Sequence, residues 1–142
     1  MIAYLDSSAL LKLYLDDEAE TEGLRDVVDV LASLATSRLA YVEVRAGLAA
    51  AQRAGRMSAA AHDVAVGDFD RAWPEYDVIE IDGTLGSRAG DVAERYGLRA
   101  GDAIHLASAL EIRDEATVVV AWDGRLRVAA AAAGLAVFPS GR

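Results

Sequence analysis

The amino-acid sequence predicts an α/β fold built on a mainly parallel sheet. Short apolar or β-branched runs, of which residues 117–121 are the clearest, alternate with segments whose apolar residues recur at spacings of three and four. Strands that alternate with helices need crossover connections, which make the strands parallel. Asp6 and Asp123 each follow such a run. Because ligands gather at the carboxyl ends of parallel strands, this pattern also indicates a site at that edge.

The chain begins with a predicted strand and helix. Residues 2–5 form an apolar run that ends at Asp6, and Ser7 and Ser8 then provide a helix start. The apolar residues at positions 10, 11, 13 and 14 favour a helix after this start. We therefore expect a buried central strand that places Asp6 at the mouth of a site.

The next elements lead to a second acidic residue. Residues 18–30 have helical apolar spacing, a short strand is expected within residues 30–35, and Ser37 is a good N-cap for the following helix. The positions of that helix expected to face the core are Leu39, Val42, Ala46 and Ala49 or Ala50. Glu43 lies on or beside this stripe, and a carboxylate there needs a partner because burying it unpaired is costly.

The second half of the chain continues the alternation. Ser58 opens a helix that ends near Trp73, where Pro74 stops it, and Asp102 lies at the start of a later helix. Asp82 has the position of a helix cap. The remaining expected elements are strands at residues 78–82, 117–121 and 135–138 and helices at residues 84–96 and 126–133.

The length and composition limit the class of protein. A chain of 142 residues is expected to form a single domain, residues 1–142, that folds without disulfides, and it contains no cysteine. Hydrophobic residues make up 54% of the chain, but the apolar stretches are too short or too interrupted to cross a bilayer. No charged and then apolar leader precedes the first strand. We expect a cytoplasmic protein with no membrane segment.

The net charge of −9 argues against simple nonspecific nucleic-acid binding through a uniformly basic surface. The charge is unevenly distributed. Residues 38–56 contain four arginines and one acid, whereas residues 57–82 contain seven acids and one arginine. The two segments are either a basic face and an acidic face or ordinary solvated helix surfaces.

Four carboxylates are candidates for one shared site: Asp6, Glu43, Asp102 and Asp123. Clustered carboxylates repel each other, and a hard divalent cation would neutralise them. Ligands that are all oxygen favour Mg²⁺ or Mn²⁺ over zinc, and such an ion suits phosphoryl chemistry. A purely structural interpretation also stands, in which Asp102 caps its helix and Asp123 only turns the chain.

Other α/β classes fit less well. A receiver domain or a phosphatase of the haloacid dehalogenase type also has an aspartate after its first strand, but it needs a later lysine, and the one lysine of this chain is Lys12. A dinucleotide-binding domain would have Gly-x-Gly-x-x-Gly after the first strand, where this chain has Asp-Ser-Ser-Ala.

Four segments, in order and spread over the whole chain, resemble those of PIN-domain ribonucleases, above all the VapC-type toxins of toxin–antitoxin pairs. These segments are residues 4–14 (YLDSSALLKLY), 37–44 (SRLAYVEV), 98–109 (LRAGDAIHLASA) and 123–135, which begins DGRL. The resemblance implies a three-layer α/β/α sandwich with a central, mainly parallel sheet of about five strands and the first strand in the middle.

The resemblance also implies roles for individual residues. Asp6, Glu43 and Asp102 match the acidic triad of the family, and Asp123 matches its fourth acid. Ser8 matches a small polar residue that supports the metal site. The family often has Thr or Ser two residues before the fourth acid, and Ala121 stands there in this chain, so any hydroxyl contribution from that position is missing.

The implied function is that of a magnesium-dependent endoribonuclease, with Mn²⁺ as a possible substitute, in which a metal-activated water cleaves RNA and leaves a 5′-phosphate. The implied partners are RNA, an antitoxin protein and a second copy of the chain. Arg99 and Arg45 are the candidates for phosphate contacts, with surface salt bridges as the alternative. His105 is expected to pack or to form a supporting hydrogen bond. The alternative function is a catalytically weak PIN-fold module that acts through an antitoxin–repressor complex.

Overall fold

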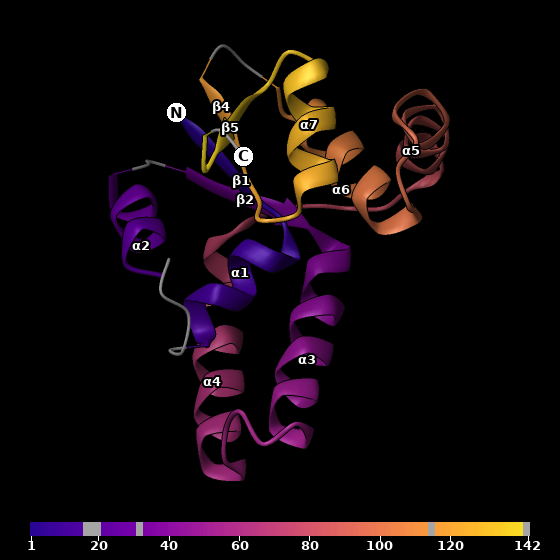
Figure 1. Cartoon of the computed structure of the whole chain (residues 1–142). Helices are drawn as coiled ribbons and strands as arrows, with labels where there is room; N and C mark the ends of the chain where they lie inside the picture. Colours follow the sequence, from indigo (N-terminus) through magenta and orange to yellow (C-terminus); the bar gives the residue numbers. More distant parts are fainter. Residues whose placement is uncertain (16–20, 31–32, 114–115, 141–142) are drawn as a thin grey trace.

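The computed structural model describes residues 1–15, 21–30, 33–113 and 116–140. In these residues five strands form one sheet in the order β3-β2-β1-β4-β5, and every neighbouring pair is parallel (Figure 1). The strands are β1 (Ile2–Leu5), β2 (Ser33–Ser37), β3 (Asp77–Ile79), β4 (Thr117–Val120) and β5 (Ala136–Phe138). The predicted parallel α/β fold with the first strand in the middle is confirmed.

Helices cover both faces of the sheet, so the molecule has the predicted three layers (Figure 1). The helices on one face are α1 (Ser7–Tyr14), α2 (Thr21–Val30), α3 (Arg38–Arg53) and α4 (Ala59–Ala72), followed by the short 3₁₀ helix η1 (Trp73–Glu75). The helices on the other face are α5 (Gly83–Tyr96), α6 (Ala100–Glu111) and α7 (Gly124–Ala132).

The alternation of side chains along β1 explains the two cores. Ala3 and Leu5 pack with the α1–α4 layer, whereas Tyr4 points to the α5–α7 layer, and all three are fully buried. A strand buried on both faces reads as a continuous apolar run, which is why residues 2–5 are recognisable from sequence.

Side-chain caps start five of the described helices, of which the caps at Ser37, Ser58 and Asp82 agree with the predicted helix starts. The first helix is capped by Asp6, one residue before the predicted serines, and α7 is capped by Asp123, which the sequence predicted only as a turn. The N-cap side chains of Asp6, Ser37, Ser58, Asp82 and Asp123 each accept a hydrogen bond from a backbone N–H two or three residues later. Three of these caps follow strands β1, β2 and β4 closely, so capping also fixes the chain at the carboxyl edge of the sheet.

The predicted inward face of α3 is wrong. The buried residues of this helix are Ala40, Val44, Leu48 and Ala51, whereas Val42 is 64% exposed. The helix is rich in alanine and valine on several sides, so the apolar spacing does not define a single stripe. Glu43 lies next to the buried stripe, as predicted, but the buried residue beside it is Val44 and not Val42.

The third strand is shorter than the predicted residues 78–82 and ends at Ile79. In the described sheet β3 lies at the edge and pairs with β2. The last pair is Ser37 with Ile79, because β2 ends at Ser37 and α3 begins at the next residue. The second strand is longer than predicted and reaches Ser37. Residues 18–20 of the predicted second helix and Leu31 lie outside the described residues.

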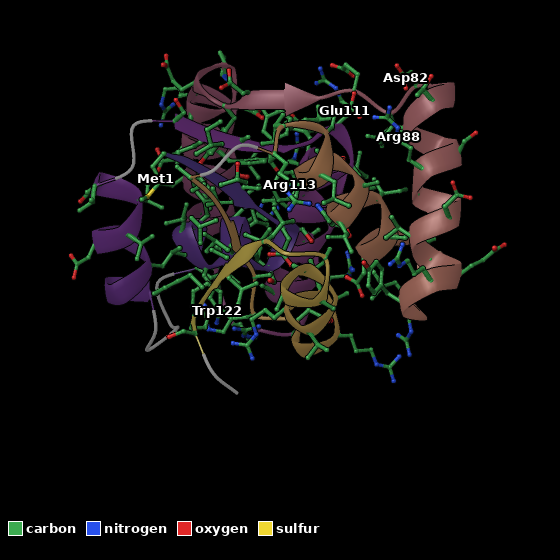
Figure 2. The ribbon with its side chains drawn as sticks, turned by 90° about the horizontal axis from the view of Figure 1, so that it is seen from above. Met1, Asp82, Arg88, Glu111, Arg113 and Trp122 are labelled. Carbon is green, nitrogen blue, oxygen red and sulfur yellow. The ribbon has the colours of Figure 1, made fainter. Side chains whose placement is uncertain are left out.

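The uneven charge is partly explained by pairing between neighbouring elements. Arg38 of α3 forms a salt bridge with Glu80, and Arg45 lies 4.0 Å from Asp70 of α4. The acidic segment therefore lies against the arginine-rich helix, in agreement with the interpretation as ordinary helix surfaces. On the other layer Arg88 of α5 points to Glu111 of α6 and donates a hydrogen bond to it at 2.5 Å (Figure 2).

None of the described helices has the length and apolarity needed to span a membrane.

Candidate active site

The predicted site lies at the carboxyl edge of the sheet, between β1 and β4. The two strands are paired with Leu5 opposite Val120, and the N–H of Asp6 donates to the carbonyl of Val120 at 3.2 Å. The chain continues from β1 into the layer on one face and from β4 into α7 on the other. Ligands of α/β proteins bind at such a divergence, which is called the β1–β4 crevice below. Asp6 directly follows β1, and Asp123 lies between β4 and α7.

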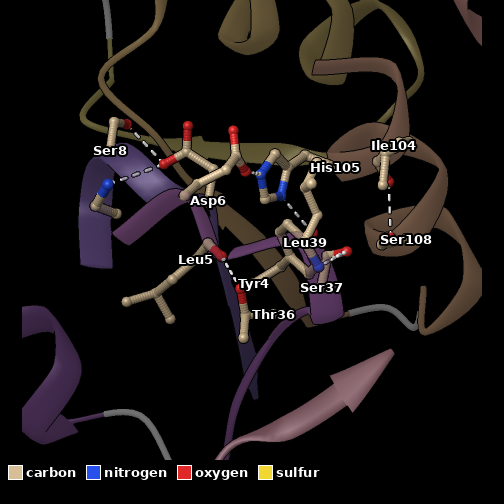
Figure 3. Close-up of polar contacts among 12 residues, drawn as sticks. Tyr4, Leu5, Asp6, Ser8, Thr36, Ser37, Leu39, Ile104, His105 and Ser108 are labelled. Atoms are coloured by element: carbon tan, nitrogen blue, oxygen red, sulfur yellow. Dashed lines mark hydrogen bonds and ion pairs between the residues drawn. The ribbon is translucent and has the colours of Figure 1, made fainter. Parts of the chain in front are cut away.

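Asp6 is the most buried of the four predicted carboxylates, with 3% of its surface exposed. Its Oδ1 accepts hydrogen bonds from Ser8 Oγ at 2.6 Å and from the N–H of Ala9 at 2.9 Å (Figure 3). Burial raises the pKa of Asp6, although these two hydrogen bonds oppose the rise. Within the described residues both hydrogen bonds to this carboxylate are to Oδ1, so Oδ2 is the oxygen available to a ligand.

Ser8 connects the two sides of the crevice. Besides its hydrogen bond to Asp6, its Oγ accepts a hydrogen bond from the N–H of Trp122 at 3.0 Å. This N–H belongs to the peptide group that follows Ala121, the position that lacks the hydroxyl typical of the family. Ser8 therefore holds both the Asp6 carboxylate and the loop that leads to Asp123.

Glu43 is held from the opposite layer. Its Oε1 lies 2.7 Å from Nε2 of His105 on α6, and the Nδ1 of the same ring lies 2.7 Å from the hydroxyl of Tyr4. His105 is 2% exposed, whereas the Glu43 side chain is 33% exposed. The supporting hydrogen bond expected of His105 is confirmed, and its second partner Tyr4 was not anticipated.

Asp102 does not cap its helix. It lies in the first turn of α6, whose N-cap residue is Arg99. Burial, followed by the negative charges of Asp123 and Glu43, raises the pKa of Asp102, and the positive charge of Arg99 opposes the rise. Glu43 also contributes to the raised pKa of Asp6. The charge of Glu43 therefore acts on both Asp6 and Asp102, and the charge of Asp123 acts on Asp102.

Asp123 combines a structural position with a place at the site. Its Oδ1 accepts a hydrogen bond from the N–H of Leu126 at 3.0 Å, so it caps α7. The residue is exposed, and its charge is the largest electrostatic contribution to the raised pKa of Asp102. The structural role of Asp123 is thus a helix cap rather than the turn expected as the alternative, and its charge still acts on Asp102.

An open cleft of about 1200 Å³ leads away from these carboxylates along α7. It is lined by Asp102 and Asp123, by three arginines, and by apolar and small residues of the neighbouring helices. The arginines are Arg99, Arg125 and Arg127. The second and third were missed from sequence, although they follow Asp123 by two and four positions. Asp6 and Glu43 lie outside this lining.

The two arginines predicted to contact phosphate are in different surroundings. Arg99 lines the cleft beside Asp102, whereas Arg45 donates a hydrogen bond to Tyr41 at 2.7 Å and faces Asp70 of α4. For Arg45, the structure therefore agrees with the alternative interpretation, a surface salt bridge.

The donor set fits a hard divalent cation. All four carboxylates supply oxygen ligands, which Mg²⁺ and Mn²⁺ prefer, and their mutual repulsion favours a bound positive charge. In the described part of the chain, however, no group of three or more His, Asp or Glu side chains is arranged to hold a metal ion by direct contact. Mg²⁺ keeps several of its waters when it binds proteins, so these carboxylates would hold it in part through water.

The chain is similar to known proteins over nearly its full length. The PIN domain family model matches residues 3–132. The chain is 39% identical to ribonuclease VapC45 of Mycobacterium tuberculosis, over 98% of this chain and 96% of that relative. Among solved structures, FitAcB from Neisseria gonorrhoeae has a TM-score of 0.72 at 19% identity and covers 97% of this chain and 96% of its own.

A toxin–antitoxin complex from Klebsiella pneumoniae also has the same fold, with a TM-score of 0.64 at 19% identity over 88% of this chain and 89% of its own. These two structural likenesses show the fold. The family-model match and the identity to a curated relative are both extensive, and they agree with the observed fold. The chain belongs to the PIN domain family.

Proposed function

We propose that the protein is a magnesium-dependent endoribonuclease and the toxin of a toxin–antitoxin pair. The observation that supports this most strongly is the parallel pairing of β1 with β4, whose ends lead to Asp6 and Asp123 at the same edge of the sheet. The charge of Glu43 contributes to the raised pKa of both Asp6 and Asp102, which supports a common site. The extensive identity to ribonuclease VapC45 supports the substrate class.

The reaction would be hydrolysis of an RNA phosphodiester. Attack by the oxygen of a water molecule forms a new P–O bond and breaks the bond to the 3′ oxygen, which leaves a 5′-phosphate and a 3′-hydroxyl. A bound Mg²⁺ would polarise the phosphate, lower the pKa of the water and stabilise the leaving oxygen. Asp6, Glu43 and Asp102 would hold the ion at least partly through water, with Asp123 orienting the attacking water or a second ion.

The protein residues also determine where the substrate lies. Asp6 is fixed by its own cap and by Ser8, so Oδ2 has a defined direction. Arg99 and Arg125, in the cleft that contains Asp102 and Asp123, would contact phosphates on one side of the scissile bond. A cleft with arginines allows an acidic protein to bind a polyanion locally, despite the net charge of −9.

The antitoxin would bind a second surface. A groove of about 730 Å³ lies between α1, α2 and α4, where Leu13, Met57 and Val64 contribute apolar side chains. Val64 is 62% exposed and lies in the lining of this groove beside Met57 and Leu13. We assign this groove to an apolar helix of the antitoxin, and the net charge favours a basic partner. The homodimer implied by the resemblance remains a prediction.

The direct test is RNA cleavage by the purified protein in Mg²⁺, in Mn²⁺ and in EDTA, with the ends of the products mapped. We expect cleavage in either ion, loss of cleavage in EDTA, and 5′-phosphate ends. Cleavage that persists in EDTA would contradict the metal-dependent mechanism. Growth arrest on expression without any RNA cleavage would favour the alternative of a binding module.

A further inference from the structure

Tyr4 and His105 are two buried polar residues that the proposed mechanism does not use. Tyr4 is fully buried in β1, and its hydroxyl lies 2.7 Å from Nδ1 of His105 on α6, with the two rings edge to face at 5.9 Å (Figure 3). The other ring nitrogen, Nε2, lies 2.7 Å from Oε1 of Glu43. The three side chains therefore form a chain of hydrogen bonds that begins in the core and ends at a candidate metal ligand.

The partners determine the direction of the hydrogen bonds. A carboxylate oxygen can only accept, so Nε2 of His105 must hold a proton and donate it to Glu43. Burial raises the pKa of Tyr4 well above its ordinary value, so the phenol keeps its proton. Nδ1, the other ring nitrogen, is hydrogen-bonded to the Tyr4 hydroxyl. The proton on Nε2 is assigned from the hydrogen-bond partners.

Glu43 needs such a support more than the other carboxylates do. Asp6 and Asp123 are fixed at helix N-caps by backbone N–H groups, whereas Glu43 lies in the second turn of α3. A long side chain that is one-third exposed would otherwise be free to sample several rotamers. His105 comes from the helix layer on the other side of the sheet, so its hydrogen bond ties α3 to α6 across the site.

The free oxygen of Glu43 has a defined direction. Oε2 lies 3.6 Å from the point where a β-carbon on Gly101 would stand, so it faces the first turn of α6, which contains Asp102. With Oε1 bound to His105, Oε2 is left for the cation.

We propose that Tyr4 and His105 are positioning residues, which hold Glu43 so that one oxygen is fixed and the other faces the metal site. This inference rests on the proposed function. It assigns to Tyr4 a role at the active site although its side chain is enclosed in the core. If both residues served core packing alone, replacing them would not change the affinity for a metal ion. Metal affinity therefore distinguishes a positioning role from a packing role.

The variants are Tyr4→Phe, His105→Leu and His105→Gln, with Tyr14→Phe as the matched control. Tyr14 is a half-buried tyrosine whose hydroxyl is 3.3 Å from that of Tyr76, away from the carboxylates. Glutamine at position 105 keeps an N–H donor for Glu43, whereas leucine does not. Mn²⁺ affinity is measured in the absence of RNA, and thermal unfolding in EDTA shows that each variant is folded.

Supporting partners of metal ligands are typically worth about 10- to 100-fold in metal affinity. We expect His105→Leu to weaken Mn²⁺ binding by that factor, Tyr4→Phe by a smaller factor, and His105→Gln to recover part of the loss. Tyr14→Phe should leave the affinity unchanged. Equal Mn²⁺ affinity for Tyr4→Phe, His105→Leu and the control would overturn the inference.

The tautomer gives a second readout that needs no metal. The sequence contains two histidines, so comparison with the His105→Gln protein assigns the ¹⁵N signals of the His105 ring. We expect the parent to carry a proton on Nε2, and Tyr4→Phe to change the chemical shift of Nδ1, because that nitrogen loses its hydrogen-bond partner. A parent without a proton on Nε2 would contradict the inference. A parent that binds no Mn²⁺ and cleaves no RNA would instead contradict the proposed function. In that case the ¹⁵N signals of the His105 ring still show whether Tyr4 is hydrogen-bonded to it.

Discussion

Ser8 Oγ accepts a hydrogen bond from the backbone N–H of Trp122, 114 positions later in the chain, at 3.0 Å. The same oxygen donates to Asp6. The Ser8 hydroxyl therefore joins the turn after β1 to the loop after β4. Ala121, next to Trp122, has no side-chain hydroxyl that could make such a bond. The two acidic residues on either side of the crevice are thus positioned relative to each other by Ser8.

Replacing Ser8 should impair the site more than the fold. Ser8→Ala removes the donor to Asp6 and the acceptor for Trp122, and we expect a loss of about 10- to 100-fold in RNA cleavage or metal affinity. Ser7→Ala, at the neighbouring position in α1, is the matched control. Equal cleavage rates for the two variants would show that Ser8 does not position Asp6.

The raised pKa values of Asp6 and Asp102 predict a pH dependence of stability in the absence of metal. Burial and repulsion disfavour the charged forms, so folding is opposed by these groups above their raised pKa values. Asp102→Asn should therefore unfold at a higher temperature than the parent at neutral pH in EDTA. The difference should shrink as the pH falls through the raised pKa towards the ordinary carboxyl value.

The measurement is thermal unfolding of parent and Asp102→Asn over pH 4 to 8. Because both proteins share all other titrating groups, the difference isolates the carboxylate. Added Mg²⁺ should stabilise the parent more than the variant, since the ion binds the folded site. A variant that is less stable than the parent at neutral pH in EDTA would show that the carboxylates do not repel each other significantly.

Arg125 should contribute to RNA binding through charge. In an Asp6→Asn background, which prevents cleavage, Arg125→Ala should weaken RNA binding and reduce the slope of log K against log salt concentration by about 1. Arg71→Ala is the control, because Arg71 is an exposed arginine that pairs with Asp68 on α4, away from the cleft. An unchanged slope for Arg125→Ala would place the RNA elsewhere.

The antitoxin groove can be tested without affecting the active site. Val64→Asp places a charge among the apolar residues of the groove, and we expect it to abolish co-purification with the cognate antitoxin while RNA cleavage persists. Val64→Thr, which keeps the shape and adds no charge, should retain much of the binding. Normal antitoxin binding by the aspartate variant would exclude this groove.

The sequence was most informative where local signals and the fold agree. The buried strand before Asp6 and the β-branched run before Asp123 are recognisable because both are buried on two faces, and their parallel pairing then brings the acids together. The end of β3 was not predictable in the same way. It depends on where β2 turns into α3, which is a property of the neighbouring strand.

The phase of α3 and the support of Glu43 required the structure for different reasons. Alanine and valine lie on several sides of α3, so its inward face is decided by packing against α1 and the sheet. The hydrogen bond between Tyr4 and His105 joins residues 101 positions apart. Neither residue is unusual in its own segment, and their contact exists because β1 and α6 meet in the fold.

The central claim is that RNA is cleaved at the carboxylates of the β1–β4 crevice. The most direct test compares the RNA cleavage rates of Asp6→Asn and Asp82→Asn in Mg²⁺. Both aspartates cap a helix by accepting from the N–H three residues later, and asparagine caps equally well, so the loss of a charged cap is matched between the two variants. Asp6 is buried and Asp82 is exposed, so thermal unfolding is measured to show that both variants are folded. We predict that Asp6→Asn lowers the cleavage rate by about 100-fold or more, while Asp82→Asn cleaves at the parent rate. Equal cleavage by the two variants would contradict the account.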